Sequence, residues 1–188
     1  MALTILTDGK AMERAMGELK SAFEQIAEDV PNIAVKWPGK WKASDVYWVA
    51  SHGIWFLPLH HKRDGSYLWL FGVQDAKKKK QLIPSCLVTL PVSRASTSAL
   101  GVLGAIAQDE TGQLFLALRR KMGGRVPNKF WDNYVGDKQK VVDGDGNQAD
   151  MFLIGCLESR EIVSKIASFV HEYTRSKSVA KKPRRKSN

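Results

Sequence analysis

The chain has 188 residues, and 44% of them are hydrophobic, which suffices for one ordinary domain with a buried core. This apolar content argues against global disorder, and the longest apolar runs, 54–59 and 114–118, are too short to span a membrane. No signal-peptide pattern begins the chain, so we expect a soluble, cytoplasmic protein, nucleoid-associated in a bacterium or nuclear in a eukaryote. The pattern predicts one domain over residues 1–175 and a basic, disordered tail over 176–188.

The net charge of +10 is concentrated in two segments. Residues 61–129 hold 12 basic and 4 acidic side chains, and residues 173–188 hold 7 basic and no acidic ones. The other segments, 1–60 and 130–172, are acidic on balance. A surface of one sign attracts polyanions and releases counterions when it meets phosphates, although lysines also simply solubilise a protein. The two basic segments together favour a polyanionic partner.

Residues 9–30 have the periodicity of an amphipathic helix, with Asp8 as its N-cap. Apolar side chains recur at positions 12, 16, 19, 23, 26 and 30, and glutamates occupy the other face. This stripe fits a helix that faces the core, and a short dimer seam through the same helix is the alternative. A partner protein, or a second copy of the chain, could use that alternative.

The middle of the chain has the pattern of strands. Segments 46–49, 54–57, 67–73, 87–90 and 113–118 are rich in aromatic and β-branched or leucine residues. Hairpin turns are predicted at 60–66, from its Asp64-Gly65 pair, and at 109–112. The stretch 37–42 has the composition of a loop.

The last part of the chain returns to helices. A short helix is predicted over 127–134, followed by strands at 140–142 and 151–154 around the turn 143–147. Ser159 is the predicted N-cap of a final amphipathic helix that reaches about residue 174. The sequence therefore predicts an α+β fold, mainly an antiparallel sheet, with an N-terminal and a C-terminal amphipathic helix.

The candidate phosphate site is the basic, glycine-bearing segment that follows the strand 113–118. Glycines permit close approach of a ligand to the backbone, and a following helix N-terminus favours anions. Both faces of the strand are apolar, so we expect it to be covered until it emerges at Arg119. The residues predicted to contact phosphate here are Arg119, Arg120, Lys121, Gly123, Gly124, Arg125 and Lys129. The motif lacks the spacing of a nucleotide-binding P-loop, and a charged strand-to-helix connection is the alternative.

Three further places are candidate nucleic-acid contacts. Lys62 and Arg63 follow the adjacent His60 and His61 at a predicted exposed hairpin tip, and Lys77 and Lys78 begin a four-lysine run. Adjacent histidines on a strand point to opposite faces, so we expect no metal there. Most of the tryptophans fit a core, whereas Trp41 alternates with lysines and is the candidate for base stacking.

The sequence contains no local catalytic motif. The strand 113–121 lacks the carboxylate that a Glu-x-Lys nuclease site needs, and Cys86 and Cys156 lie in apolar runs typical of buried free thiols. The acidic turn 143–147 departs from a calcium loop at its later ligand positions. We predict no cofactor and no metal, and a nuclease whose site is assembled from distant residues stays an alternative.

Part of the C-terminal half resembles uncharacterised bacterial domains that can accompany restriction-type nucleases. The resemblance covers the segment 112–124, Phe130, the turn 141–146 and the segment 166–170. It implies an accessory role linked to nucleic acid, with no catalytic residues to carry over. The sequence thus favours a non-enzymatic nucleic-acid-binding protein, with DNA favoured over RNA, and a protein-interaction module is the competing class.

Overall fold

The computed structural model describes residues 2–29, 40–43, 45–63, 65–74, 82–90, 102–119, 128–134, 136–143 and 145–180. Within them the helices are α1 (Gly9–Glu24), α2 (Asn128–Asn133) and α3 (Ile162–Ala180), with a short 3₁₀ turn, η1, at Ala50–His52. The strands are β1 (Leu3–Leu6), β2 (Trp41–Ala43), β3 (Tyr47–Val49), β4 (Ile54–His61), β5 (Tyr67–Gln74), β6 (Leu82–Leu90), β7 (Val102–Gln108), β8 (Leu114–Arg119), β9 (Asp137–Val142) and β10 (Gln148–Cys156). The predicted α+β class is confirmed.

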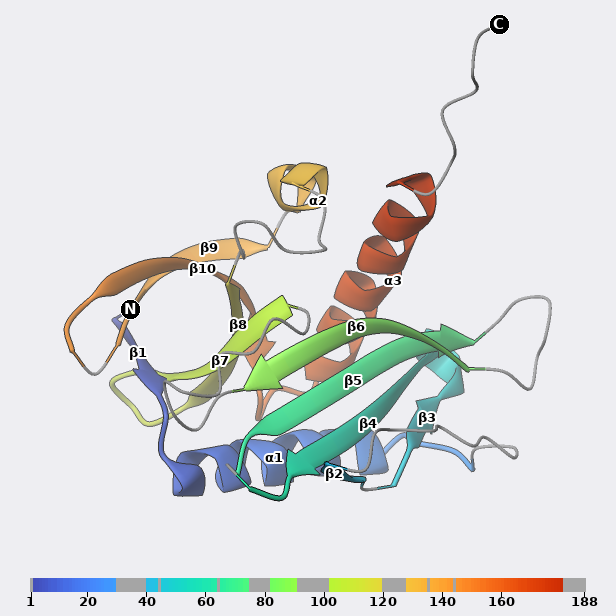
Figure 1. Ribbon diagram of the computed structural model, residues 1–188, viewed down its shortest axis with the longest axis horizontal. Coiled ribbons are helices and arrows are strands. Elements are labelled where there is room, and N and C mark those ends of the chain that lie inside the picture. The colour runs from blue at the N-terminus through green and yellow to red at the C-terminus, as the bar shows by residue number, and fades with distance from the viewer. Residues whose placement is uncertain are drawn as a thin grey trace, which may run out of the picture.

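All the described strands belong to one sheet, in the order β1-β9-β10-β8-β7-β6-β5-β4-β2, and β3 pairs with β4. The pairs β1–β9 and β6–β7 are parallel, and the other described pairings are antiparallel. Because β1 also pairs with β7, the strands β1, β9, β10, β8 and β7 close into a five-stranded barrel. Figure 1 shows this ring beside the more open part formed by β4, β5 and β6.

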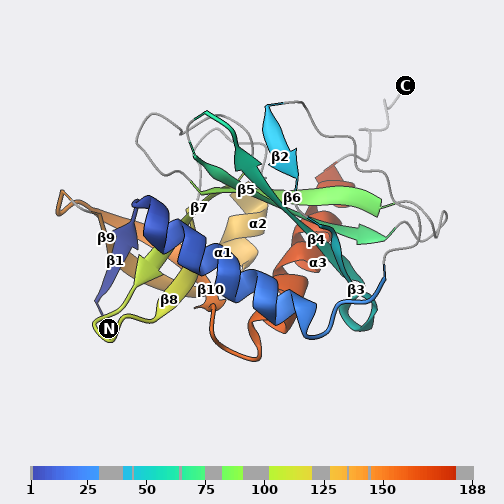
Figure 2. The same ribbon diagram turned by 90° about the horizontal axis from the view of Figure 1, so that it is seen from below.

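The two faces of the sheet carry separate apolar clusters. One face packs against α1, α2 and α3, and Phe23, Phe56, Trp69, Leu116 and Val170 belong to this helix-side core. The opposite face of the barrel strands encloses a smaller cluster around Leu3, Phe115, Ala117, Val141 and Met151. On β4 and β5 the same opposite face carries Trp55, Leu57, Leu59, Leu68 and Leu70. In Figure 2, α1 crosses from the barrel to β3 and lies against the helix-side face of both parts.

Helix α1 begins as the sequence predicts and ends earlier. The Asp8 carboxylate accepts a hydrogen bond from the backbone N–H of Ala11 at 2.8 Å, which confirms the N-cap. The predicted end at residue 30 is wrong, because the helix stops at Glu24 and Ile26 is 41% exposed. The chain turns there because the N–H of Glu28 bonds the carbonyl of Trp48 and thereby joins strand β3.

The apolar stripe of α1 faces the core of its own chain. Met12, Met16, Leu19 and Phe23 are buried, Phe23 with no exposed surface, and its ring lies 4.8 Å from that of Phe56. The stripe therefore faces the core of its own chain, as the first of the two interpretations predicts. These buried side chains are not available to form a dimer seam with a partner. Trp48, Trp55 and Trp69 are also buried, as the core interpretation of the tryptophans predicts.

Several other boundaries differ from the sequence prediction. Strand β1 was not predicted, β2 replaces part of a predicted loop, and β4 continues through His61 into the predicted turn. Strands β6, β9 and β10 are each longer than predicted, with Pro84 inside β6. Helix α3 extends to Ala180, past the predicted start of the tail at residue 176, while 181–188 lie outside the described residues. Cys156 is free and half-buried rather than buried.

Two predicted turns are confirmed, with their hydrogen bonds. At 109–112 the Asp109 carboxylate accepts from the N–H of Thr111 at 2.9 Å and of Gln113 at 3.0 Å. At 143–147 the Asp143 carboxylate does the same for Asp145 and Asn147. The Ser159 hydroxyl accepts from the N–H of Glu161 at 3.2 Å in the turn before α3, and the helix begins at Ile162, later than the predicted N-cap implies. Among the described helices, none is long and apolar enough to cross a membrane.

Candidate nucleic-acid interface

Strand β2 and the residue before it bring Lys42 and Lys40 beside the β4–β5 turn, which carries Lys62 and Arg63. The ladder pairs Trp41 with His61 and Lys42 with His60, and the N–H of Lys62 donates to the carbonyl of Lys40 at 3.3 Å. Two predicted contacts, Trp41 and the pair Lys62 and Arg63, therefore lie next to each other. We call the resulting surface the hairpin patch, which comprises Lys40, Trp41, His61, Lys62 and Arg63.

Backbone hydrogen bonds hold the turn that presents these side chains. The N–H of His61 donates to the carbonyl of Ser66 at 2.8 Å, and the N–H of Gly65 donates back to the carbonyl of His61 at 3.2 Å. Gly65 has a φ of 70°, a left-handed conformation that glycine adopts without strain. The two bonds close the chain into a short loop, so Lys62 and Arg63 are both exposed at its tip.

Trp41 and His61 form the aromatic part of the patch. Their ring centroids are 4.8 Å apart, with the planes inclined at 65°, an edge-on contact. Trp41 is half-buried and packs against the cluster on the face of the sheet remote from the helices. His61 is half-buried as well, whereas full exposure of both histidines was predicted. An aromatic ring among cations can stack on a base while the cations bind phosphates.

Lys42 and His60 lie on the other face of the same strands, which faces α1. Together with Glu13, Met16 and Lys20 of α1 and with Leu59 and Tyr67 they line a cleft of about 250 Å³. The rings of His60 and Tyr67 are 4.9 Å apart. Burial raises the pKa of the Tyr67 hydroxyl, and the negative charge of Glu13 adds to that effect. The cleft therefore keeps its phenol protonated and able to donate a hydrogen bond.

Arg119 emerges from the core as the sequence predicts. The five residues Leu114–Leu118 are all buried, with the leucines in the helix-side core and Phe115 and Ala117 inside the barrel. Arg119, the next residue, is exposed at the end of β8. By the two-residue alternation of a strand, Arg119 belongs to the face that carries Ala117, remote from the helices.

The register relates Arg119 to the hairpin patch. Arg119 pairs with Leu103, which pairs with Thr89, then Leu68 and finally Leu59. These four steps of about 4.8 Å each place Arg119 about 20 Å from Leu59 along one line of the sheet. Leu59 and Leu68 lie on the face remote from the helices, which is also the face of Trp41. Arg119 and Trp41 therefore share a face without being in contact.

The remaining predicted contacts are only partly described. Arg120, Lys121, Gly123, Gly124 and Arg125 lie outside the described residues, as do Lys77 and Lys78. Lys129 lies in the first turn of α2, where the backbone alone is described. The described segments that contain β6, β7 and β8 end or begin at Leu90, Val102 and Arg119. The pairing of β6 with β7 and of β7 with β8 makes these three points neighbours.

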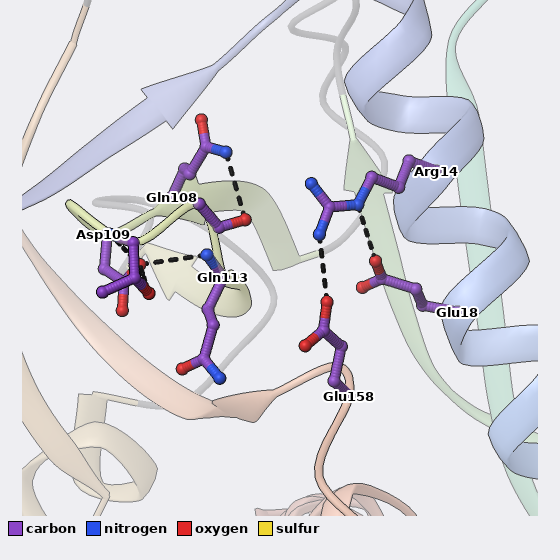
Figure 3. A network of polar contacts seen from close by, with 8 residues as sticks. Arg14, Glu18, Gln108, Asp109, Gln113 and Glu158 are labelled. Atoms are coloured by element: carbon purple, nitrogen blue, oxygen red, sulfur yellow. Dashed lines mark hydrogen bonds and ion pairs between the residues drawn. The ribbon is translucent and has the colours of Figure 1, made fainter.

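A second polar arrangement joins α1 to the chain before α3 (Figure 3). Arg14 donates to the carboxylate of Glu18 at 2.8 Å and to that of Glu158 at 3.0 Å. Burial raises the pKa of Glu18, and the hydrogen bond from Arg14 acts in the opposite direction. Glu18 and Glu158 also line a groove of about 750 Å³, along with Ile26. This ion-pair network joins α1 to the turn that precedes α3.

Sequence reasoning missed part of the site. Lys40 and Lys42 flank Trp41 in the motif that alternates aromatic residues with lysines, and this motif could have identified both lysines as site residues. Lys20 and Tyr67 have no local signal, because only the packing of α1 on the sheet brings them to the cleft. His60 and His61 point to opposite faces, and no group of three or more His, Cys, Asp or Glu residues suited to a metal occurs in the described part of the chain.

The geometry thus assembles four exposed cations, two histidines and one aromatic ring at the end of a hairpin. Comparisons of the chain with protein-family models, with curated protein sequences and with solved structures gave no match.

Proposed function

We propose that this protein binds nucleic acid, DNA in preference to RNA, and acts as a non-catalytic accessory protein. The observation that carries the proposal is the convergence of β2 with the β4–β5 turn, which brings Lys40, Lys62 and Arg63 beside Trp41. Sequence-tolerant binding of single-stranded nucleic acid combines two components. Cations contact the phosphate backbone, and an aromatic ring stacks on a base. Phosphate contacts of this kind supply affinity without base readout.

Further cations extend the proposed interface. Arg119 lies on the same face as Trp41, and the segment that carries Arg120, Lys121 and Arg125 follows it at the end of β8. Lys77 and Lys78 belong to the segment between Gln74 and Leu82, which pair at the end of the β5–β6 ladder opposite to Tyr67 and Leu90, so we propose them as a separate contact. Residues 181–188 hold five cations and no acidic side chain, and we propose that they raise affinity and association rate without sequence preference. The resemblance to domains that accompany restriction-type nucleases also supports an accessory role.

A binding panel tests this proposal. The full chain is titrated onto single-stranded DNA, duplex DNA and RNA of equal length at two salt concentrations, by fluorescence anisotropy, with Mg²⁺ added in parallel to detect cleavage. We expect binding that weakens steeply with salt, because bound phosphates release counterions. Cleavage in Mg²⁺ that persists through purification would instead support the nuclease alternative.

A pair of matched variants assigns the binding to the hairpin patch. Lys62→Gln/Arg63→Gln removes two exposed cations from the turn, and Lys138→Gln/Lys140→Gln removes two exposed cations from β9, which lies away from β2 and β4 in both Figures 1 and 2. The first variant should lower the salt slope on duplex DNA by about 1.8, at about 0.9 for each phosphate contact. The second should leave it unchanged. Equal slopes for the two variants would contradict the assignment.

A protein-interaction module is the second candidate, and Ile26 is the observation that favours it. Ile26 is exposed over 41% of its surface and lines the groove between α1 and the chain before α3. An apolar contact of this kind depends little on salt. A partner complex that survives high salt and is lost in Ile26→Ser would therefore support this function over nucleic-acid binding.

A further inference from the structure

The cleft between α1 and the hairpin combines cationic and hydroxyl donors around a small volume. Lys20 comes from α1, Lys42 from β2, and His60 and Tyr67 from the paired ends of β4 and β5. Met16 and Leu59, both buried, complete the lining. We propose that this cleft binds a single phosphate group and holds the terminal phosphate of a strand bound to the hairpin patch, a proposal that rests in its second part on the function proposed above.

The donors suit a phosphate because they come from three directions. Lysine is a compact point charge with three donors, and hydrogen bonds between a cation and phosphate oxygens are about twice as strong as neutral ones. The Tyr67 hydroxyl stays protonated, since burial and the neighbouring Glu13 raise its pKa. A helix, an edge strand and a central hairpin each contribute at least one donor, so an anion in the cleft would be held from separate elements of the fold.

The size of the cleft limits what it can take. Its volume of about 250 Å³ lies below the roughly 300–1,000 Å³ of pockets that enclose drug-sized ligands. A whole nucleotide would therefore not be enclosed, whereas a phosphate with the first atoms of its sugar would be. A terminal phosphate is linked to the rest of the strand on one side only. An internal phosphodiester is linked on both sides, so the strand would have to both enter and leave the cleft. A phosphomonoester also carries more charge, about −1.5 to −2 at neutral pH.

Among the described residues that line the cleft, Glu13 alone carries a carboxylate. Its negative charge opposes a bound phosphate, so two substitutions should act in opposite directions. Lys42→Gln removes a favourable charge and should weaken phosphate binding by about tenfold, the usual effect of losing a hydrogen bond to a charged group. Glu13→Gln removes an unfavourable charge and should strengthen it. Both residues are exposed, so both variants should fold.

The first experiment uses inorganic phosphate as the probe. Phosphate is titrated into the full chain and followed by the amide and side-chain NMR signals of the cleft residues, with Lys140→Gln as the matched charge control on β9. We expect saturable shifts at the cleft, weaker binding in Lys42→Gln, tighter binding in Glu13→Gln and no change in the control. Shifts that are equally affected by Lys42→Gln and Lys140→Gln, or no saturable shifts, would overturn the phosphate site.

The second experiment compares one DNA strand with a 5′-phosphate, with a 3′-phosphate and with neither. One phosphorylated form should bind about tenfold more tightly than the unphosphorylated strand, and the difference should vanish in Lys42→Gln. Equal binding of all three strands would overturn the terminal-phosphate proposal and leave nucleic-acid binding standing. Lys42-dependent binding of inorganic phosphate with no binding of any strand would contradict the proposed function and assign the cleft to a free phosphate compound.

Discussion

The indole ring of Trp41 meets the imidazole ring of His61 edge-on, with ring centroids 4.8 Å apart. The contact joins the edge strand β2 to the end of β4 and fixes an aromatic surface beside Lys40, Lys62 and Arg63. One side of the indole packs against the apolar cluster of the sheet, so its orientation is set before any ligand arrives. A pre-oriented ring loses little side-chain entropy when a base stacks on it.

Trp41→Ala should weaken binding of single-stranded DNA by about tenfold or more, since stacking of a base on an aromatic ring contributes about 1–3 kcal/mol. Fluorescence anisotropy at one fixed salt concentration measures the change. Trp41→Phe keeps a ring and should retain most of the affinity, provided that both variants give the circular dichroism spectrum of the parent. Equal affinities for the alanine and phenylalanine variants would show that the ring does not stack on a base.

Replacing Arg119, Arg120 and Arg125 together by glutamine should lower the salt slope on duplex DNA by about 2.7, at about 0.9 for each phosphate contact. Affinity should fall by a similar factor for unrelated DNA sequences, because phosphate contacts do not read bases. The variant Lys138→Gln/Lys140→Gln provides the control for a change of net charge. An unchanged slope in the folded triple variant would move the main phosphate contact to the hairpin patch or to Lys77–Lys80, or favour the protein-partner function.

Glu18 should make the stability of the protein depend on pH. Burial raises its pKa above the ordinary value of 4.5, so folding favours the protonated carboxyl group. The stabilisation from this group is complete below pH 4.5 and is lost as the pH rises through the raised pKa. The free energy of unfolding of Glu18→Gln, which cannot ionise, should therefore increase relative to the parent over that range and then level off.

Denaturant unfolding at a series of pH values measures this difference. Arg14 lowers the pKa of Glu18 through its hydrogen bond at 2.8 Å, so Arg14→Gln should shift the transition to higher pH. A difference between Glu18→Gln and the parent that stays constant from pH 4 to pH 8 would contradict the raised pKa. The same would follow if Arg14→Gln moved the transition to lower pH.

Asp109 should have the opposite pH dependence. The Thr111 hydroxyl lowers the pKa of its carboxyl group below 3.8 by donating a hydrogen bond at 2.7 Å, and the N–H groups of Gln113 and Thr111 act in the same direction (Figure 3). Its contribution is present above the ordinary pKa and is lost as the pH falls through the lowered one. Asp109→Ala should lower the melting temperature at pH 7, and the effect should shrink toward pH 2.

Glu110→Ala provides the control in the same turn, because no described hydrogen bond of the turn involves its carboxylate. A melting temperature that falls equally in Glu110→Ala and Asp109→Ala would show that the turn depends on charge alone. A fall confined to Asp109→Ala supports the role of its hydrogen bonds, which hold β7 and β8 in register.

The local chemistry of the chain determined much of the fold. The Asp8 carboxylate caps α1 as predicted, and the two predicted turns form with the Asp109 and Asp143 carboxylates bonded to backbone N–H groups within four residues. The alternation along 114–118 also predicted that β8 would be covered on both faces and that Arg119 would emerge. Such features need only neighbouring residues, so the sequence pattern is sufficient to find them.

Long-range pairing decided the rest. The short apolar segment Leu3–Leu6 becomes a strand only because β7 and β9 flank it and close the barrel. Helix α1 ends at Glu24 because Glu28 finds a partner in Trp48, although the apolar periodicity continues to residue 30. Trp41 reaches His61, and Lys20 reaches the cleft with Tyr67, through the register of β2 and the packing of α1. The local sequence of a strand does not show which other strand it will pair with. The contacts that make up the candidate site depend on such pairings, so they exist only in the folded chain.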